Sequence, residues 1–572
     1  MKMPFIAVRK KIISTYLITF LVQSMFAQTY TKENFTLPMK GSFTLSGDFG
    51  EIRSNHFHMG ADLRLRTGRP IYAVADGYIS RIKTEPGGYG KALYVDHPNG
   101  FRSVYAHLDR FTPELEAFIR TKQMQSKDFT TLVYLDASKF PVKKGDLIAY
   151  GGNSGYSFGP HLHFEIRRSK NDNAINPYHF FKLDYDNRSP QIFNMLISPA
   201  DSTGSIFGKN ETAFFKLSGN NNRYYPTQKI TASGKIGIAI QAIDRKPGQR
   251  NRYSVYRTAV YADDEKIFDF RKDEISYYET RYLNSFIDYE LYANRKLRYT
   301  NLFKEKGNRL SIYNTSANTG YITIKAGEKK RVKIQVFDFS GNKSEINFTL
   351  HGEAYQAKPN TACKNKFIAG EKNFFIRPDF RFMSDKHSFY KDFCFTYQKK
   401  PAYGKLLSDW HLIHQSDFPV HEDVYISIKV ENTNPEIQDK LCIVRQDSRG
   451  NLKYSGGKYI KGFVSTEIKR FGLYGLTADT IPPRIYAHNF RPGSSVKHLN
   501  ELQFKATDNL SGIHSYETFV NGKKALLIYD LKDDIISCQI DDSLLTGEQI
   551  HLKIVLFDKK ANKTVYNTNF FK

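Results

Sequence analysis

The stretch GPHLHFEIR, residues 159–167, alternates polar and apolar side chains behind a Gly-Pro pair. Successive side chains of a β-strand point to opposite faces, so the alternation predicts a strand with two unlike faces. The apolar face would hold Leu162, Phe164 and Ile166, and the polar face His161, His163 and Glu165. The apolar face suits a hydrophobic core. The polar face suits either solvent or a metal ion, and one HxH pair does not decide between them.

A second stretch, NHFHMGADLRL at residues 55–65, supplies the partners that a metal site would need. His58 and Asp62 are four residues apart, so they share a face if this segment is a strand. Gly60 between them leaves room above the backbone. Two imidazoles and one carboxylate are a standard ligand set for catalytic zinc, with the fourth position kept for water. His58 and Asp62 together with His163 could form that set.

A third stretch, RSVYAHL at residues 102–108, brings another imidazole. Read as a strand, it has a polar face of Ser103, Tyr105 and His107 and an apolar face of Val104, Ala106 and Leu108. His107 is thus another imidazole on a polar face, and His161 would lie beside the metal without binding it.

These stretches belong to three longer segments whose order and glycine positions carry a family resemblance. The segments are HMGADLRLRTGRPIYAVADGYI (58–79), GGYGKALYVDHPNGFRSVYAHL (87–108) and VKKGDLIAYGGNSGYSFGPHLHFEIR (142–167). They resemble the successive signatures of the LytM/lysostaphin-type (M23) zinc metallopeptidases, over roughly residues 40–182. The family cleaves peptide bonds in the stem or cross-bridge peptides of bacterial cell walls.

The resemblance implies one Zn²⁺ per chain, bound by His58, Asp62 and His163, with His107 and His161 as catalytic residues. Zinc acidifies a water molecule and polarises the scissile carbonyl. The chain has no HExxH glutamate to act as base, and histidine titrates near neutral pH. We expect His161 and His107 to share the activation of water, the stabilisation of the oxyanion and the protonation of the leaving amine, in a division that the sequence leaves open.

Five further side chains have predicted places around this site. Glu165 is expected to hydrogen-bond and orient an imidazole rather than to bind the metal. Tyr105 and Tyr156 are expected to line the substrate groove. His56 is expected at the rim, with a role as a rival of the aspartate ligand as the alternative, and His97 is expected in a hairpin turn.

The segment between the second and third motifs is longer than the short connection usual in the family. Thr112-Pro113-Glu114 is a typical helix start, with a cap, a proline and an acidic residue. Leu115, Phe118 and Ile119 would give that helix an apolar stripe. We expect about three turns packed beside the groove, where the helix could shape specificity or restrict access.

The N-terminus predicts export. A basic region precedes the apolar run IISTYLITFLVQSMFA, and Ala27-Gln28 offers a cleavage point, so residues 1–27 are interpreted as a cleaved signal peptide. A membrane anchor is the alternative, but the run is short and interrupted by polar residues. We expect the mature chain to be periplasmic or extracellular, associated with the cell envelope, and without an integral membrane span.

The charge and the cysteines agree with that location. The formal net charge is +26, which favours anionic cell-envelope polymers as partners, although charge for solubility alone is the alternative. Nucleic acid is not expected, because the basic residues are spread along the chain and no nucleic-acid-binding module is visible. An exported chain permits disulfides, and Cys363 with Cys394 is the first pair to test among four cysteines.

The C-terminal two-thirds contains a repeat in two copies. Residues 186–192 match 479–485, residues 244–248 match 508–512, and residues 333–343 match 553–563. Each copy opens on a proline-containing linker, has an early Asp-to-Gly turn and closes on an alternating strand with an Asp/Asn turn. This pattern is typical of a small antiparallel sandwich. The first copy carries an insertion at roughly 250–320, and a third β unit lies between the copies.

With 572 residues, the chain is long enough for several domains, and its abundant Tyr, Phe, Ile, Thr and Val favour β structure. We predict a mainly β protein, with an N-terminal antiparallel β-sheet metallopeptidase domain that carries a short inserted helix, followed by about three Ig-like β-sandwich units. The predicted boundaries are 1–27 for the signal, 28–183 for the peptidase, 184–353 for the sandwich with the insertion, 354–478 for a sandwich-like domain and 479–572 for the last sandwich.

The leading hypothesis is a zinc-dependent endopeptidase that cleaves peptidoglycan cross-links. A catalytically inactive protein that binds peptidoglycan or regulates a hydrolase is the alternative, and an adhesive envelope protein is the third reading. The scissile bond would be D-Ala to diaminopimelate in a Gram-negative-type wall, or Gly–Gly in a glycine-bridged wall. The lack of a recognisable wall-targeting SH3-like module favours the former.

Overall fold

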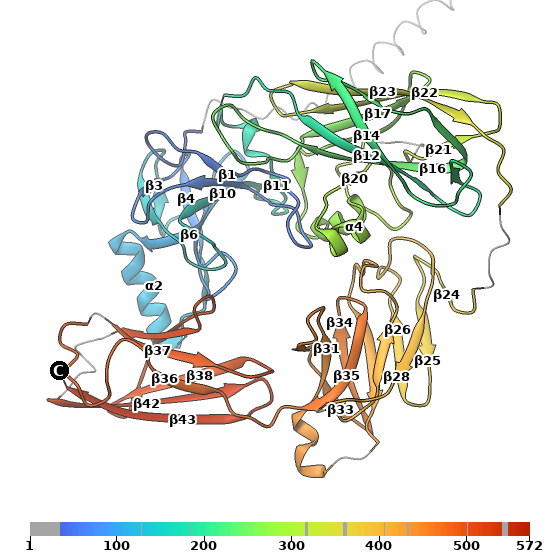
Figure 1. Ribbon diagram of the computed structural model, residues 1–572. Helices are drawn as coiled ribbons and strands as arrows, with labels where there is room; N and C mark the ends of the chain where they lie inside the picture. The colour runs from blue at the N-terminus through green and yellow to red at the C-terminus, as the bar shows by residue number, and fades with distance from the viewer. Residues whose placement is uncertain are drawn as a thin grey trace, which may run out of the picture.

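The computed structural model describes residues 35–571 except 127, 184, 315–318, 358–362, 405, 432–433, 500 and 540–546. The expected signal peptide lies outside the described residues. No helix in the described part of the chain is long and apolar enough to cross a membrane. Four β units follow one another along a path that returns to its start, so the C-terminal unit lies under the N-terminal one (Figure 1). The prediction of a mainly β protein is confirmed.

The first unit is a 12-stranded sheet with the central order β1-β2-β10-β6-β5-β4-β7. Its strands are β1 (Leu45–Gly47), β2 (Ala61–Arg64), β3 (Pro70–Tyr72), β4 (Gly77–Thr84), β5 (Lys91–Asp96), β6 (Phe101–Phe111), β7 (Thr131–Tyr134), β8 (Pro141–Val142), β9 (Leu147–Gly151), β10 (His161–Arg168) and β11 (Ala174–Ile175), with β19 (Glu274–Ile275) added from the second unit. A short 3₁₀ turn, η2 (Pro177–His179), follows the last of its own strands.

Strand β10 has the two unlike faces that its sequence predicts. Leu162, Phe164 and Ile166 are each 0% exposed and belong to the core of the unit. The strand lies between β2 and β6, and His163 pairs with Asp62 on one side and with Ala106 on the other. The register therefore places a predicted histidine ligand directly opposite the predicted aspartate ligand.

Strand β6 departs from simple alternation, and one prediction is wrong for that reason. The pairing of β6 with β5 is irregular near its end, and His107 has a positive φ of 59°. Because of this irregularity, the side chains of His107 and Tyr105 do not share one face of the strand. Tyr105 is 0% exposed, packs its ring against Phe164 and uses its hydroxyl to accept from the Val74 N–H at 3.0 Å. Tyr105 is a core residue and does not line a substrate groove.

The inserted helix, α2 (Pro113–Ser126), begins at the predicted proline and is 14 residues long. Leu115 and Ile119 are buried, and the helix packs on β6 and β7. The sequence analysis places this helix beside the substrate groove. That prediction is wrong, because no residue of α2 lines the groove described below. The helix lies instead next to the C-terminal unit (Figure 1), where the charge of Arg120 acts on Cys538.

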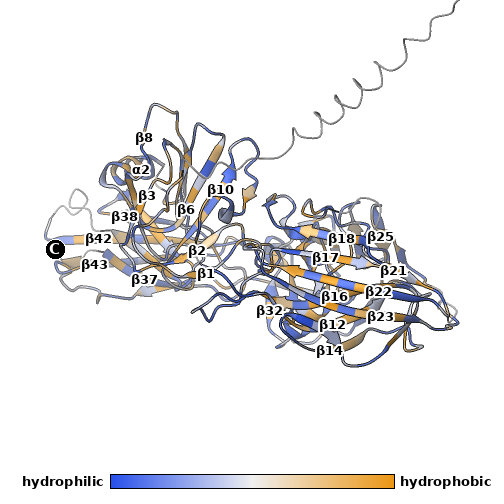
Figure 2. Cartoon of the chain, turned by 90° about the horizontal axis from the view of Figure 1, so that it is seen from above, coloured by the Kyte–Doolittle hydropathy of each residue, from blue (hydrophilic) through white to orange (hydrophobic). Residues whose placement is uncertain are grey.

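The second unit is an 11-stranded arrangement of two layers. Its strands are β12 (Gln191–Pro199), β13 (Ser205–Ile206), β14 (Ala213–Asn220), β15 (Arg223–Pro226), β16 (Ile230–Ile243), β17 (Arg257–Ala262), β18 (Glu265–Arg271), β20 (Thr300–Asn301), β21 (Ile322–Ile324), β22 (Lys329–Phe337) and β23 (Lys343–Gly352). The helical turns η3 (Thr280–Tyr282), α3 (Leu283–Phe286) and α4 (Tyr289–Arg295) come from its insertion. Hydrophobic and hydrophilic segments alternate along its strands (Figure 2), as expected of sheets with one buried face.

The first two units are joined through buried structure. Strand β19 pairs with β11 and so extends the first sheet with residues of the insertion. Phe57 and Met59 of the first unit lie in the same hydrophobic cluster as Phe270 and Phe286 of the second. A shared cluster of this kind fixes the second unit against the segment that contains His58.

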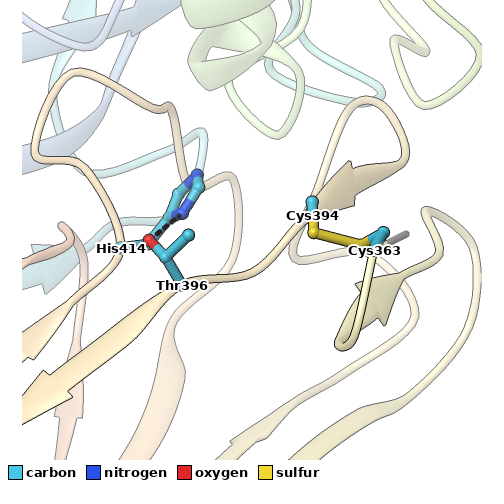
Figure 3. The surroundings of a disulfide bond; sticks show 4 residues. All are labelled: Cys363, Cys394, Thr396 and His414. Carbon is cyan, nitrogen blue, oxygen red and sulfur yellow. Dashed lines mark hydrogen bonds between the residues drawn. A yellow bond between two sulfur atoms is a disulfide. The ribbon is translucent and has the colours of Figure 1, made fainter. Parts of the chain in front are cut away.

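The third unit packs two five-stranded sheets around its own core. One sheet contains β25 (Asn373–Ile376), β26 (Phe380–Ser384), β30 (Val424–Lys429), β34 (Phe463–Ile468) and β33 (Lys458–Ile460), and the other contains β28 (Tyr397–Lys400), β29 (Trp410–Ile413), β35 (Gly472–Ala478), β31 (Leu441–Gln446) and β32 (Leu452–Tyr454). A small pair, β24 (Lys366–Phe367) with β27 (Phe393–Cys394), and the 3₁₀ turn η4 (Pro435–Lys440) complete it. Cys363 and Cys394 form the predicted disulfide (Figure 3).

The fourth unit is a sandwich of two four-stranded sheets. One contains β36 (Arg484–Ala487), β37 (Glu501–Thr507), β41 (Ile535–Gln539) and β40 (Leu527–Asp530), and the other contains β39 (Lys523–Ala525), β38 (Ile513–Val520), β42 (Gln549–Asp558) and β43 (Lys563–Phe571). The fourth unit contacts the first one, because the Lys532 ammonium donates to the Asn153 carbonyl at 2.6 Å.

The burial of the apolar face of β10 predicts how substitutions there change the free energy of unfolding. Phe164→Ala should lower the free energy of unfolding of the first unit by about 3–5 kcal/mol, because it leaves a cavity in a packed core. Phe158→Ala, at a fully exposed position, should change it by less than about 0.5 kcal/mol. Urea denaturation of both variants measures this, and an equal loss in the two would contradict the assignment of faces.

Candidate metal centre and active site

Three side chains converge on one point at the edge of β2 and β10. His58 Nε2, Asp62 Oδ1 and His163 Nδ1 are separated by 2.9 Å, 2.9 Å and 3.0 Å. Ligands of a tetrahedral zinc ion lie about 3.3 Å apart, so an outward shift of a few tenths of an ångström would admit the ion. The donor set, two imidazoles and one carboxylate, fits zinc. These are the three residues predicted as ligands, and all three are buried.

The other ring nitrogen of each histidine is held by an acceptor. His58 Nδ1 donates to the Asp48 carbonyl at 2.7 Å, and His163 Nε2 donates to Glu165 Oε1 at 2.7 Å. An imidazole whose one nitrogen donates to an oxygen presents the lone pair of the other nitrogen to a metal. Glu165 thus lies where the sequence placed it, behind a histidine and not on the metal.

Two further histidines, His107 and His161, lie beside the three candidate ligands and line the same pocket. His107 Nδ1 donates to the Ser154 carbonyl and His161 Nδ1 to the Gly159 carbonyl, each at 2.8 Å. A carbonyl oxygen only accepts, so Nδ1 carries the proton and Nε2 carries the lone pair. His161 Nε2 is 3.5 Å from Asp62 Oδ1, and the rings of His107 and His161 lie 4.8 Å apart between centroids.

Burial keeps both of these imidazoles neutral. It lowers the pKa of His107 to about 3, and the electrostatic interaction with the neighbouring His163 and His161 rings contributes less to this shift. It also lowers the pKa of His161, although the Asp62 carboxylate opposes this shift. Two neutral imidazoles whose Nε2 atoms carry a lone pair can accept a proton from water at neutral pH.

A groove of about 1150 Å³ runs over the five residues. Tyr156 and Phe158 border it as exposed aromatic side chains, and Arg53 and His56 border it from the opposite segment. His56 is exposed and hydrogen-bonds through Nδ1 to the Ser54 carbonyl, so it is at the rim as predicted. An open groove with aromatic and basic walls accommodates an extended polymer segment.

The comparisons with known proteins concern this region and the third unit. Residues 56–131 and 124–177 match the sequence model of Peptidase family M23, and residues 364–479 match that of a Zu5-like domain. Residues 56–177 form an M23-type peptidase domain. The resemblance inferred from the three motifs is confirmed.

Two curated relatives and one solved structure illustrate the similarity of the M23 domain. The DD-carboxypeptidase/endopeptidase Mpg of Neisseria meningitidis is 35% identical over 120 residues, which are 21% of this chain and 22% of that protein. The peptidoglycan DD-endopeptidase ShyB of Vibrio cholerae is 28% identical over 109 residues, which are 19% of this chain and 20% of that protein. The catalytic domain of lysostaphin from Staphylococcus simulans is 22% identical with a TM-score of 0.19, over 24% of this chain and 91% of that one. The chain therefore spans about a fifth of the length of these curated relatives.

The M23 domain holds Glu165 in a closed network that the sequence did not reveal. Glu165 is 0% exposed and accepts from Tyr89 Oη at 2.6 Å, Tyr277 Oη at 2.6 Å and Arg167 Nε at 2.6 Å. Although burial opposes it, the Arg167 charge and the His163 hydrogen bond hold the pKa of Glu165 far below its usual range. Glu165 is therefore a carboxylate that fixes the orientation of His163.

Tyr277 belongs to the second unit, 112 residues beyond Glu165. It follows β19, the strand that the insertion adds to the first sheet. The only sequence signal was the Tyr-rich composition of the insertion, which does not point to a partner. The sandwich with the insertion thus contributes a side chain to the surroundings of the M23 metal centre.

The remaining prediction, for His97, is confirmed. His97 directly follows strand β5 at the hairpin turn, where Nδ1 hydrogen-bonds with the Asp76 carbonyl at 2.9 Å and Nε2 with Ser103 Oγ at 2.8 Å. It does not face the groove.

The pKa of His163 predicts proton release when the M23 domain binds a metal. Burial disfavours the imidazolium, but hydrogen bonds with Asp62 and Glu165 raise the pKa to about 9. Below that pH the metal displaces a proton, so the apparent Zn²⁺ affinity should fall about tenfold for each pH unit from 8 to 6. Titration calorimetry at pH 7 in buffers of different ionisation enthalpy should show about one proton released per ion. Binding without proton release would contradict the assignment.

The contact from the second unit gives a separate prediction. Tyr277→Phe removes a donor to Glu165 without changing packing, and it should weaken Zn²⁺ binding and activity by about tenfold. Tyr278→Phe, at the next and largely exposed position, is the matched control and should leave both unchanged. Zinc competition with a chromogenic chelator measures the affinity. Equal behaviour of the two variants would show that the network does not act on the metal.

Proposed function

We propose that this chain is an exported zinc metalloendopeptidase that cleaves the peptide cross-links of peptidoglycan. The observation that carries the proposal is the convergence of His58, Asp62 and His163 with two neutral histidines in one open groove. The M23 match and relatives named for peptidoglycan endopeptidase activity supply the substrate class.

The donor set favours zinc, one ion per chain, held by His58 Nε2, Asp62 Oδ1 and His163 Nδ1. When bound there, zinc would polarise the scissile carbonyl and acidify a water molecule. His161 and His107 act with their Nε2 atoms, which accept a proton from the attacking water and return it to the leaving amine. Their Nδ1 hydrogen bonds to fixed carbonyls keep both rings in the required tautomer.

The groove and the charge fit a wall polymer. Tyr156, which is 67% exposed, offers a ring against which a peptide segment can pack. Arg64 lines the same groove and suits the carboxylates of stem peptides. The net charge of +26 favours retention at anionic envelope polymers. The names of the two curated relatives favour the D,D cross-link over a glycine bridge.

Digestion of purified sacculi tests the proposal. The zinc-loaded chain should release cross-link cleavage products identified by mass, and His163→Ala should release none. His107→Ala and His161→Ala should each reduce the rate by about 10²–10⁴-fold while keeping the zinc, because neither is a ligand. His56→Ala, at the exposed rim of the same groove, is the matched control and should stay within a few-fold of wild type.

Metal content separates the outcomes of this experiment. Loss of zinc in His161→Ala would show that the residue is a ligand. Release of the same products by wild type and His163→Ala would contradict the enzymatic hypothesis and favour that of a peptidoglycan-binding protein.

A further inference from the structure

The repeat found in the sequence brings three aspartates together in each of its two copies. Asp479, Asp508 and Asp558 of the fourth unit each place a carboxylate oxygen within 4.8 Å of the other two. Asp186, Asp244 and Asp338, their counterparts in the second unit, do the same. We propose that the cluster of the fourth unit, named here the Asp479 cluster, is a Ca²⁺ site.

The Asp479 cluster contains a buried carboxylate oxygen that has no hydrogen-bond partner among the described residues. Asp479 is 1% exposed, and its Oδ1 has no hydrogen-bond partner in the described part of the chain. Asp508 Oδ1 and the hydroxyl of Ser511 are likewise buried without a partner. An anionic oxygen withdrawn from water without a donor is costly, and a cation removes that cost.

Hydrogen bonds from backbone N–H groups hold all three carboxylates in place. Asp479 Oδ2 accepts from the Ser511 N–H at 3.0 Å, and Asp508 Oδ2 accepts from the Gly512 N–H at 2.8 Å. Asp558 Oδ1 accepts from the Asn562 N–H at 2.8 Å. These bonds fix the three carboxylates, while Asp479 Oδ1 and Asp508 Oδ1 have no partner among the described residues. Both oxygens of Asp558 accept, because its Oδ2 also takes a hydrogen bond from Asn562 Nδ2 at 2.7 Å.

The charge balance calls for a divalent ion. The Lys560 ammonium, whose charge acts on Asp479 and Asp558, donates to the Gly457 carbonyl at 2.7 Å. Three carboxylates and one ammonium carry a net charge of −2, which one divalent cation neutralises. Oxygen-only ligands select a hard cation. Ca²⁺ accepts six to eight oxygens in flexible geometry, whereas Mg²⁺ demands an octahedron and gives up its water reluctantly. Ser511 Oγ, backbone carbonyls and water would complete the ligand set.

The counterpart cluster in the second unit differs in one respect that limits the proposal. Asn342 there bonds to Asp338 as Asn562 bonds to Asp558, so the frame is the same. In the described part of the chain, however, none of its carboxylate oxygens is both buried and unsatisfied. The buried Lys246 also lies beside it and acts on Asp244. The proposal is therefore confined to the Asp479 cluster.

The position of the cluster indicates what the ion would do. Asp479 directly follows β35, the last strand of the third unit, and its N–H donates to the Lys440 carbonyl at 3.0 Å. The ion would join this linker to the turn after β37 and to the β42–β43 turn. Binding would therefore stiffen the junction between the third and fourth units and so fix the unit that contacts the M23 domain.

Calcium binding to the full mature chain, first loaded with one equivalent of Zn²⁺, tests the proposal. Calorimetric titration with CaCl₂ should give one site with a Kd of about 10⁻⁴–10⁻³ M, the range of extracellular calcium modules. At ten times the Kd, the melting temperature of the fourth unit should rise by about 5 °C or more. The same concentration of MgCl₂ should give a smaller shift.

Three variants locate the ion. Asp508→Asn keeps an acceptor for the turn but removes the charge, and it should weaken Ca²⁺ binding at least tenfold. Without calcium it should melt no lower than wild type, because it relieves repulsion among carboxylates. Asp244→Asn, the same change in the other copy, should bind Ca²⁺ like wild type. So should Asp447→Asn, whose carboxylate caps a similar but isolated turn through the Arg449 and Asn451 N–H groups.

The proposal is overturned by either of two results. One is wild-type protein that shows no binding heat and no melting shift at 10 mM CaCl₂, a concentration of about ten times the weakest expected Kd. The other is calcium binding that Asp244→Asn abolishes and Asp508→Asn does not. If Asp508→Asn does not fold, Asp479→Asn replaces it, since that change also keeps the acceptor for Ser511.

Discussion

The pairing of β2 with β10 is the constraint on which the functional centre depends. It sets Asp62 opposite His163 across two hydrogen-bonded strands, so the ligand geometry is fixed by backbone register rather than by flexible side chains. A slip of β10 by one residue would send His163 to the opposite face and separate it from Asp62. The apolar residues of β10 prevent that slip, because the same movement would expose Phe164 and its neighbours. The alternation of polar and apolar side chains along β10 therefore determines both the packing of the core and the positions of the metal ligands.

The second unit also contributes to the surroundings of the metal centre. It supplies Tyr277 to the carboxylate behind His163 and a strand to the edge of the first sheet. It also shares a hydrophobic cluster with the residues on either side of His58. Removal of this unit would expose the cluster and open the network around Glu165. The M23 domain and the sandwich that follows it are best regarded as one folding unit with respect to the metal centre.

The alternation of polar and apolar residues predicted much of this arrangement. Where the prediction failed, the reason is physical. The two faces of β10 and the start of α2 follow from alternation and capping, which involve neighbours in sequence. Tyr105 was misplaced because a bulge with a left-handed residue at His107 breaks the alternation, and no pattern in the stretch announces a positive φ there. Tyr277 could not be assigned, since its contact with Glu165 joins segments 112 residues apart.

The contact between Lys532 and Asn153 has a consequence for the chain as a whole. An exposed interaction of this size would not hold two separate proteins together. The intervening units tether the partners, so the contact forms at the effective concentration of an intramolecular ligand. Proteolytic cleavage in the linker between the third and fourth units would remove the covalent tether of this contact, and the loop that contains Asn153 would then lose its neighbour without any change in its own residues.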